Sequence, residues 1–351
     1  ASEANEANRF GWVVEIDPRR PTQAPVKRTA LGRFKHESAT VTLAADRRVV
    51  VYMGDDEAFE YIYKYVSDDP YQASDPAGGG HLLDRGTLYV ARFSPDRRGR
   101  WLALQHGRNG LVAATGFADQ AEVLIRARQA ADLVGATKMD RPEWIAVHPQ
   151  TGEVYCTLTS NRRRSVADAA NPRAPNAFGH IIRWREAADD AAAIDFSWDI
   201  FLLCGDPQHA DAGQRGNIRG DAFGSPDGLW FDAQGRLWIQ TDAPGAAIRG
   251  GDYERLGNNQ VLVADVGNGE VRRFLTGPNG CEITGLTGTP DGCNLFVNIQ
   301  HPGEAPGARS DPAQPMATSG WPANQFPEAS GGRPRSATIV IRRRDGGLVA
   351  G

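Results

Sequence analysis

The sequence lacks the features that would assign it to several common classes of protein. Its 351 residues hold only four cysteines, Cys156, Cys204, Cys281 and Cys293, and no two of them form a CxxC pair. A zinc ribbon or a disulfide framework is therefore not expected, although a single disulfide could form. GxGxxG, Walker and GxSxG patterns are also missing, so nucleotide-binding folds and serine hydrolases have no support.

Long hydrophobic runs and a strong excess of one charge are missing as well. The longest apolar runs, such as residues 145–147, are far shorter than the roughly 20 residues that cross a bilayer. The first residues, 1–5, contain neither the basic stretch nor the apolar segment of a signal peptide. The net charge of −4 predicts no nucleic-acid polymer and no membrane surface as a partner. An anionic substrate would therefore need local cations to attract it.

Short β-rich segments between frequent glycines and prolines predict an all-β chain with minor helical insertions. The 40 glycines and 22 prolines separate segments that read as strands, such as 48–53, 86–93 and 336–341. Two stretches are expected to be helical, 119–135 and 186–194. Three others have the composition of long loops that could cover a functional face: 69–80, 161–179 and 302–334.

An internal repeat is the most informative feature of the sequence. Each copy has an acidic residue, a strand, a turn with glycine or aspartate, and a second strand; the copies begin at Glu143, Asp227, Glu282 and, more weakly, Glu37. Such hairpins bury little alone but pack around an axis as the blades of a β-propeller. We therefore expect one propeller domain over residues 1–351 with about four blades. Tryptophans inside the repeat strands, 144, 230 and 238, are expected in the blade cores.

The repeat also predicts where the chemistry lies. The first strand of a blade lines the central channel, so Glu37, Glu143, Asp227 and Glu282 should converge at one mouth. The ends of the second strands should return beside them with Asp55, Asp56, Thr159, Asp242, Gln300 and His301. Carboxylates this close would protonate unless cations neutralised them, and oxygen ligands suit calcium or ferric iron. The alternative is that each acidic residue only caps a turn.

Three basic residues are candidates for contacts with substrate. Arg141 stands two residues before Glu143, so strand alternation aims both side chains the same way, where the guanidinium could grip a phosphate in a bidentate fork. A structural ion pair is the alternative. Lys35, two residues before Glu37, offers similar chemistry, and His301 could be a ligand or a general acid. We expect no function for His148 and His180.

Several motifs carry a resemblance to the PhoX-type alkaline phosphatases. They are RFGWVVEIDP (9–18), LGRFKHE (31–37), VYMGDDE (51–57), RPEW (141–144), SPDGL (225–229), NIQHPGE (298–304) and RPRSAT (333–338). The resemblance implies an exported, periplasmic or secreted phosphomonoesterase on a six-bladed propeller with calcium and iron. Glu37, Glu143 and Asp227 would be metal ligands and Arg141 a phosphate contact. The metal ions would supply the nucleophile, so no nucleophilic side chain is required.

The repeat and the QHPGE run extend this set of residues. Glu282 and Glu304 are added as ligands, and Asp55 and Asp242 are expected to join them. Members of the family carry a long segment upstream of the point that matches Ala1, with further ligands that include a cysteine. The chain thus resembles the C-terminal part of the family, a monomer that a missing N-terminal segment could complete. An incomplete site would hold calcium without the iron.

Two other functions remain open from the sequence. The Asp227–Leu229 segment with its following turn also resembles calcium-dependent lactonase propellers, which need no arginine for phosphate; turnover of a lactone without phosphatase activity would favour that function. A non-enzymatic binding or scaffold propeller would be indifferent to loss of the clustered carboxylates. The arginine at position 141 and the motifs along the whole chain favour the phosphatase.

Overall fold

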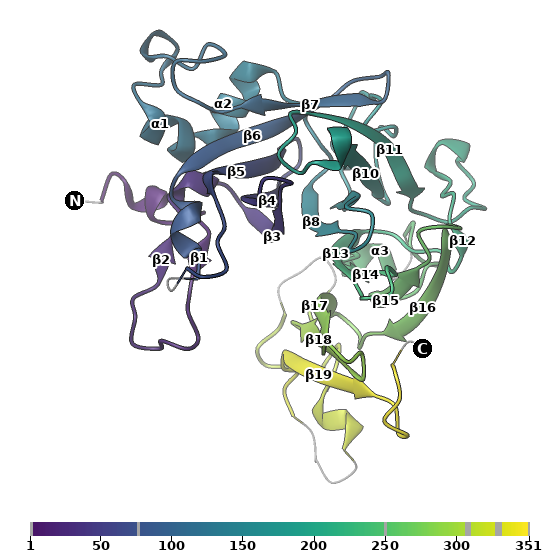
Figure 1. Cartoon of the computed structure of the whole chain (residues 1–351). Helices are drawn as coiled ribbons and strands as arrows, with labels where there is room; N and C mark the ends of the chain where they lie inside the picture. The colour runs from purple at the N-terminus through teal and green to yellow at the C-terminus, as the bar shows by residue number, and fades with distance from the viewer. Residues whose placement is uncertain (1–2, 76–77, 249–250, 306–309, 327–331, 350–351) are drawn as a thin grey trace.

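Antiparallel strands make up most of the molecule (Figure 1). The computed structural model describes residues 3–75, 78–248, 251–305, 310–326 and 332–349. A nine-stranded sheet has the order β3 (His36–Leu43), β4 (Arg48–Asp55), β5 (Ile62–Pro70), β6 (Gly86–Phe93), β7 (Arg98–Ala103), β11 (Asp195–Leu203), β10 (His180–Glu186), β9 (Val154–Leu158) and β8 (Pro142–Val147).

Three further sheets contain the remaining strands of the described residues. A five-stranded sheet has the order β12 (Arg219–Gly220), β16 (Glu270–Thr276), β15 (Gln260–Ala264), β14 (Leu237–Thr241) and β13 (Pro226–Phe231), with only the β12–β16 pair parallel. A three-stranded sheet holds β17 (Glu282–Gly288), β18 (Asn294–Gln300) and β19 (Ala337–Arg342), and a two-stranded one holds β1 (Val14–Glu15) and β2 (Val26–Lys27).

The predicted hairpins begin four propeller-like units. They are β3–β4, β8–β9, β13–β14 and β17–β18, and their first strands contact one another in that order, β3 with β8, β8 with β13, and β13 with β17. We call the units blades 1 to 4: β3–β7, β8–β11, β13–β16 and β17–β19. In Figure 1 they follow one another around an arc. The predicted all-β propeller fold with about four blades is confirmed in the part of the chain that the structure describes.

Burial on both faces of the inner strands explains why these segments form blades. Side chains alternate between the two faces of a strand. Along β4, Val51 and Met53 pack into one core cluster, whereas Val50 and Tyr52 pack into another. Blades 1 and 2 are also joined at their outer strands, where β7 pairs with β11. Of the tryptophans expected in blade cores, Trp238 is fully buried, and Trp144 and Trp230 are partly buried.

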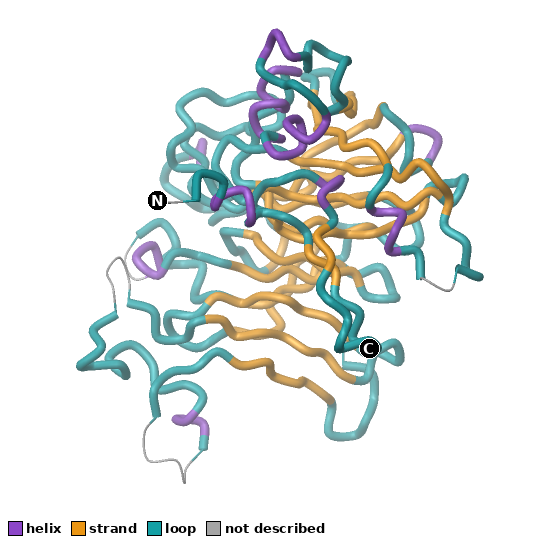
Figure 2. Tube along the Cα trace, turned by 90° about the vertical axis from the view of Figure 1, so that its left-hand side faces the viewer, coloured by secondary structure: helices purple, strands orange, loops and turns teal. Residues whose placement is uncertain are grey.

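One of the two predicted helical stretches is correct. Residues 119–135 form α1 (Gln120–Ile125) and α2 (Ala127–Val134), and Figure 2 shows both helices at one end of the molecule, outside the strands. Asp119 caps α1 by accepting a hydrogen bond from Glu122 N at 2.9 Å. The prediction for 186–194 is wrong. Glu186 ends β10, and only one 3-10 turn follows, because Ala188 and Asp189 both have φ of 57°.

Short helical turns occupy several connections. They are α3 (Gly245–Ile248) and the 3-10 turns η1 (Glu6–Arg9), η2 (Thr29–Leu31), η3 (Gly80–Leu83), η4 (Ala113–Thr115), η5 (Ala187–Asp189), η6 (Ala212–Gln214) and η7 (Ala323–Gln325). Residues 161–179 form a loop as predicted. The predicted loops 69–80 and 302–334 include positions 76–77, 306–309 and 327–331, which lie outside the described residues. All four cysteines are free thiols. None of the described helices is long and apolar enough to cross a membrane.

Candidate metal centre

A β-bulge interrupts the first strand of every blade, and acidic residues lie in two of these bulges and directly before a third. The register shifts lie between Glu37 and Thr40, Pro142 and Ile145, Pro226 and Leu229, and Thr284 and Thr287. A bulge re-aims the side chains that it contains. Glu143 and Asp227, inside their bulges, and Glu37, directly before its bulge, converge from three blades. In blade 4 the bulge comes two residues after Glu282, so that glutamate keeps the direction of an ordinary strand residue.

Three carboxylates meet where blades 1, 2 and 3 join. One oxygen each of Glu37, Glu143 and Asp227 lies within 4.8 Å of the others. Glu143 and Asp227 are buried, and Glu37 is partly buried. Trp144 Nε1 donates to Glu37 Oε2 at 3.1 Å. No hydrogen-bond donor among the described residues contacts the Asp227 carboxylate. Buried negative charges without such partners are costly unless bound cations compensate them.

Burial and mutual repulsion make these groups hard to ionise. Burial, followed by the charge of Asp227, raises the pKa of Glu143 well above its ordinary value. Burial, followed by the charge of Asp242, raises the pKa of Asp227 in the same way. Burial, followed by the charge of Asp56, also raises the pKa of Glu37. A bound cation would remove this penalty, because it favours the charged form of each carboxylate.

Among the described residues, Arg141 is the guanidinium that contacts this group of carboxylates. Its Nη2 lies 2.8 Å from Asp56 Oδ1 and 3.1 Å from Glu143 Oε1. The expectation that Arg141 and Glu143 point the same way is therefore confirmed, and the arginine does form ion pairs. Its Nη1 makes no contact with an acceptor among the described residues, and its side chain is 31% exposed. One edge of the guanidinium is thus available to a ligand.

A second acidic group, from blades 3 and 4, extends the centre on one side. Glu282 Oε2 accepts a hydrogen bond from Gln300 at 2.6 Å and lies 3.4 Å from His301 Nε2. Burial, with the charge of Asp242, raises the pKa of Glu282 to about 7. His301 Nδ1 lies 3.5 Å from the exposed Glu304. Asp242, His301 and Glu304 line a cavity of about 370 Å³.

Two of the predicted site residues point elsewhere. Asp55 is fully buried and accepts a hydrogen bond from Arg128 Nε, on α2, at 2.7 Å. Asp56 faces the carboxylates in its place, as its contact with Arg141 shows. Lys35 lies at the rim, where its Nζ forms an exposed ion pair with Glu57 at 2.8 Å.

Sequence reasoning gave no role to four further arginines, which pair with carboxylates outside the central three: Arg128, Arg162, Arg163 and Arg164. Arg128 belongs to the helix pair, and no motif connects it to Asp55. The run Arg162-Arg163-Arg164 gave a usable signal, because three adjacent cations in a loop need partners. Each reaches a different region: Arg162 contacts Asp252 at 2.6 Å, Arg163 contacts Glu57 at 3.3 Å, and Arg164 contacts Asp140 at 2.5 Å.

Comparison with known proteins agrees with this arrangement. The family model described as alkaline phosphatase PhoX matches residues 1–303. The structure of Pseudomonas fluorescens PhoX in complex with vanadate, a transition state analogue, is 49% identical with a TM-score of 0.89. The match covers 98% of this chain and 59% of that one, so the chain spans less than two thirds of its relative. That it corresponds to the C-terminal part stays a prediction.

Other similarities are too distant to carry an argument. A protein of unknown function from Dyadobacter fermentans is 8% identical with a TM-score of 0.34, over 90% of this chain and 68% of that one. A glucose dehydrogenase is 12% identical with a TM-score of 0.30, over 82% and 78%. No curated protein sequence matches significantly. The family match and the 49% identical structure decide the assignment, and the chain belongs to the PhoX alkaline phosphatase family.

Proposed function

We propose that this chain carries the metal-dependent active centre of a phosphomonoesterase. The observation that supports this most is the convergence of Glu37, Glu143 and Asp227 from three blades, with Arg141 beside them. Membership of the PhoX family adds to it, as does the vanadate complex of the Pseudomonas fluorescens relative, because vanadate has the charge and shape of a phosphoryl group in transfer.

The residues of the centre fit hard cations. Their donors are carboxylate oxygens, which suit calcium and ferric iron, and the Asp227 carboxylate lacks a protein donor among the described residues. We propose Glu37, Glu143 and Asp227 as the central ligands, with Asp242, Glu282 and Glu304 as further ligands on the side of the cavity. Bound cations would polarise the phosphoryl oxygens and activate a water molecule as nucleophile.

The protein's own basic groups would bind and orient the ester. Arg141 would use its free Nη1 edge to hold a phosphoryl oxygen, since guanidinium groups pair well with phosphate. His301, between Glu282 and Glu304, would give a proton to the leaving alcohol. Lys35 at the rim would attract the anionic substrate, whereas Asp55 would act indirectly, by holding Arg128 and α2.

We propose further that residues 1–351 form one propeller domain and act as a monomer. The continuous contacts from β3 through β8 and β13 to β17 support a single domain. Export to the periplasm or the medium is proposed from family membership.

Hydrolysis of an aryl phosphate, with calcium and then with a chelator, tests the function. We expect calcium-dependent turnover that Glu143→Gln reduces at least 100-fold, a usual effect of losing a group at the reacting centre (roughly 10²–10³). Glu153→Gln, in the turn at the opposite end of the same hairpin, is the control and should keep activity. Turnover of a lactone but not of phosphate would favour a lactonase. A folded chain that binds no calcium and hydrolyses neither ester would favour a scaffold.

A further inference from the structure

Two residues with strained backbone precede the buried ligands. Arg141 has φ of 58° and Ser225 has φ of 50°, and each is followed by proline and stands two residues before a proposed ligand, Glu143 or Asp227. Residues other than glycine rarely adopt this left-handed conformation, and a residue before proline prefers extended backbone. Such turns persist only where the surrounding structure holds them.

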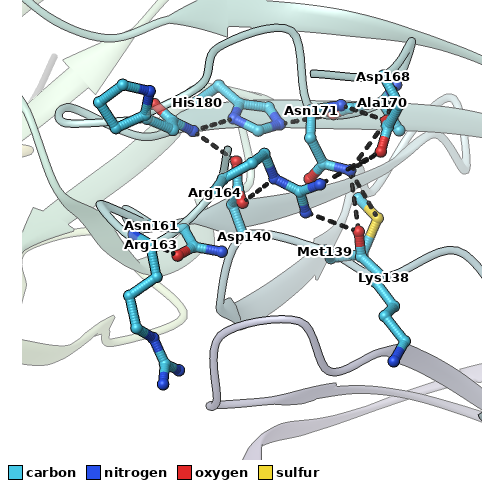
Figure 3. Close-up of polar contacts among 12 residues, drawn as sticks. Lys138, Met139, Asp140, Asn161, Arg163, Arg164, Asp168, Ala170, Asn171 and His180 are labelled. Atoms are coloured by element: carbon cyan, nitrogen blue, oxygen red, sulfur yellow. Dashed lines mark hydrogen bonds and ion pairs between the residues drawn. The ribbon is translucent and has the colours of Figure 1, made fainter. Parts of the chain in front are cut away.

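The loop 161–179, between β9 and β10, contacts the first of these turns through Asp140, the residue before Arg141 (Figure 3). Arg164 Nε donates to Asp140 Oδ1 at 2.5 Å, and Asn176 Nδ2 donates to Asp140 Oδ2 at 3.0 Å. Arg164 and Asp140 have side chains that are 6% and 0% exposed. Both oxygens of this carboxylate are therefore held by one loop.

The groups that hold Asp140 are themselves fixed. Arg164 Nη2 donates to the carbonyl of Lys138 at 2.8 Å, and Asn171 Nδ2 donates to the same carbonyl at 3.0 Å. Asn176 Nδ2 also contacts His180 Nδ1 at 3.1 Å. In Figure 3 these side chains form one connected network, while Arg163 points away from it.

The same loop contacts the second strained turn. Ser225 N donates to the carbonyl of Phe178 at 2.9 Å. Tyr253 OH donates to the carbonyl of Ala177 at 2.8 Å and lies 2.8 Å from Ser225 Oγ, so the serine hydroxyl donates to the tyrosine oxygen. Ser225 and Tyr253 are both buried. One loop from blade 2 thus holds a strained turn in its own blade and another in blade 3.

We propose that the loop 161–179 positions the metal centre. It keeps Arg141 and Ser225 in the left-handed conformation and thereby sets the separation of Glu143 and Asp227, with Asp140 and Tyr253 as positioning residues that contact neither metal nor substrate. The inference rests on the proposed function, because it takes the two carboxylates as cation ligands.

Calcium titration of the purified 351-residue chain by calorimetry tests the proposal. Tyr253→Phe removes only the hydroxyl between Ser225 and Ala177, and we expect calcium to bind at least fivefold more weakly. Tyr65→Phe is the matched control, because Tyr65 OH donates to the carbonyl of Leu82 at 2.7 Å in the core of blade 1. Both variants should lose similar thermal stability, and only the first should lose affinity. Unchanged affinity in Tyr253→Phe, or an equal loss in both, would overturn the proposal.

A second pair of variants examines the other turn. Asp140→Asn should weaken the binding of inorganic phosphate at least fivefold, whereas Glu186→Gln, which breaks the buried ion pair with Lys64 and contacts neither Asp140 nor Arg141, should not. If the wild-type chain bound no calcium, the proposed function would fail. Crystal structures would then decide the positioning separately: a relaxed φ at Ser225 in Tyr253→Phe supports it, and an unchanged turn refutes it.

Discussion

Arg141 Nη2 lies 3.1 Å from Glu143 Oε1, and the two residues are separated only by Pro142. Without a cation, the guanidinium is the nearest counter-charge of the buried glutamate among the described residues, and it lowers the pKa of Glu143, which burial and Asp227 raise. A cation bound by the carboxylates would compete with Arg141 for Glu143. Metal binding would therefore release Arg141 from Glu143, while Asp56 still holds one side of the guanidinium and the other side can contact a phosphoryl oxygen.

Replacing Arg141 should separate phosphate binding from metal binding. Arg141→Gln is expected to weaken the binding of inorganic phosphate at least tenfold, about 1.4 kcal/mol, because the guanidinium is lost. Calcium should bind as tightly or more tightly, since a competing positive charge has gone. Calorimetric titrations of both ligands check this, with Arg100→Gln as the control, because Arg100 is exposed on the outer strand β7 and pairs with Asp195. Loss of calcium binding in Arg141→Gln would show that the arginine acts structurally instead.

Neutralising Asp227 should have opposite effects on the free and the loaded protein. In a chelator, Asp227→Asn is expected to raise the free energy of unfolding by at least about 1 kcal/mol. Burial and repulsion disfavour the charged form of Asp227 in the folded protein, and the neutral amide does not carry this cost. With calcium, the variant should lose most of the stabilisation that the wild type gains. Urea denaturation under both conditions measures this. A variant that is less stable without metal would contradict the account of the centre.

The repeat predicted the blades and the carboxylate cluster because both depend on local patterns. An acidic residue at the start of an alternating strand can be read from the sequence, as Glu143 and Asp227 show. The sequence does not show which of Asp55 and Asp56 faces the carboxylates. That depends on the contact of Asp55 with Arg128, which lies on a helix over 70 residues away. The stretch 186–194 looked helical by composition. Its first residue is instead fixed in β10 by long-range contacts with Lys64 and Tyr52.

Close contact between blades 1 and 2 should make Gly54 intolerant of a side chain. A Cβ added at Gly54 would lie 2.1 Å from the carbonyl oxygen of Glu143, a backbone atom that cannot move aside alone. Gly54→Ala is expected to destabilise the protein by about 1–3 kcal/mol and to weaken calcium binding. Gly267→Ala is the control, because its Cβ would approach only the end of an exposed aspartate side chain at 3.2 Å. Equal midpoints of urea denaturation for the two variants would refute this.

A buried ion pair should join the outer parts of blades 1 and 2. Lys64 Nζ lies 3.2 Å from Glu186 Oε1, and their side chains are 1% and 3% exposed. Lys64→Met alone is expected to cost about 3–5 kcal/mol, because the buried glutamate loses its counter-charge. Adding Glu186→Gln should recover at least half of this, since the amide oxygen still accepts from Tyr52 and Trp101. Thermal unfolding of the single and double variants tests this, and additive losses would contradict it.

The buried His180 should make folding stability fall in mild acid. Burial lowers the pKa of His180 to about 4 from an ordinary 6.5, against the opposing effect of Asp140. The neutral ring is well satisfied: Nδ1 accepts from Asn176, and Nε2 donates to the carbonyl of Ala170 at 2.9 Å.

As the pH falls below 6.5, the unfolded chain takes up a proton at this residue before the folded one does. The part of the folding stability that depends on a neutral His180 is therefore fully present above pH 6.5 and is lost as the pH falls toward 4. Between pH 7 and 5, the wild type should lose roughly 2 kcal/mol more than His180→Gln. Urea denaturation at the two pH values measures this difference, with the exposed His106→Gln expected to behave as the wild type. An equal loss in the wild type and His180→Gln would mean that the buried ring is protonated in the folded protein.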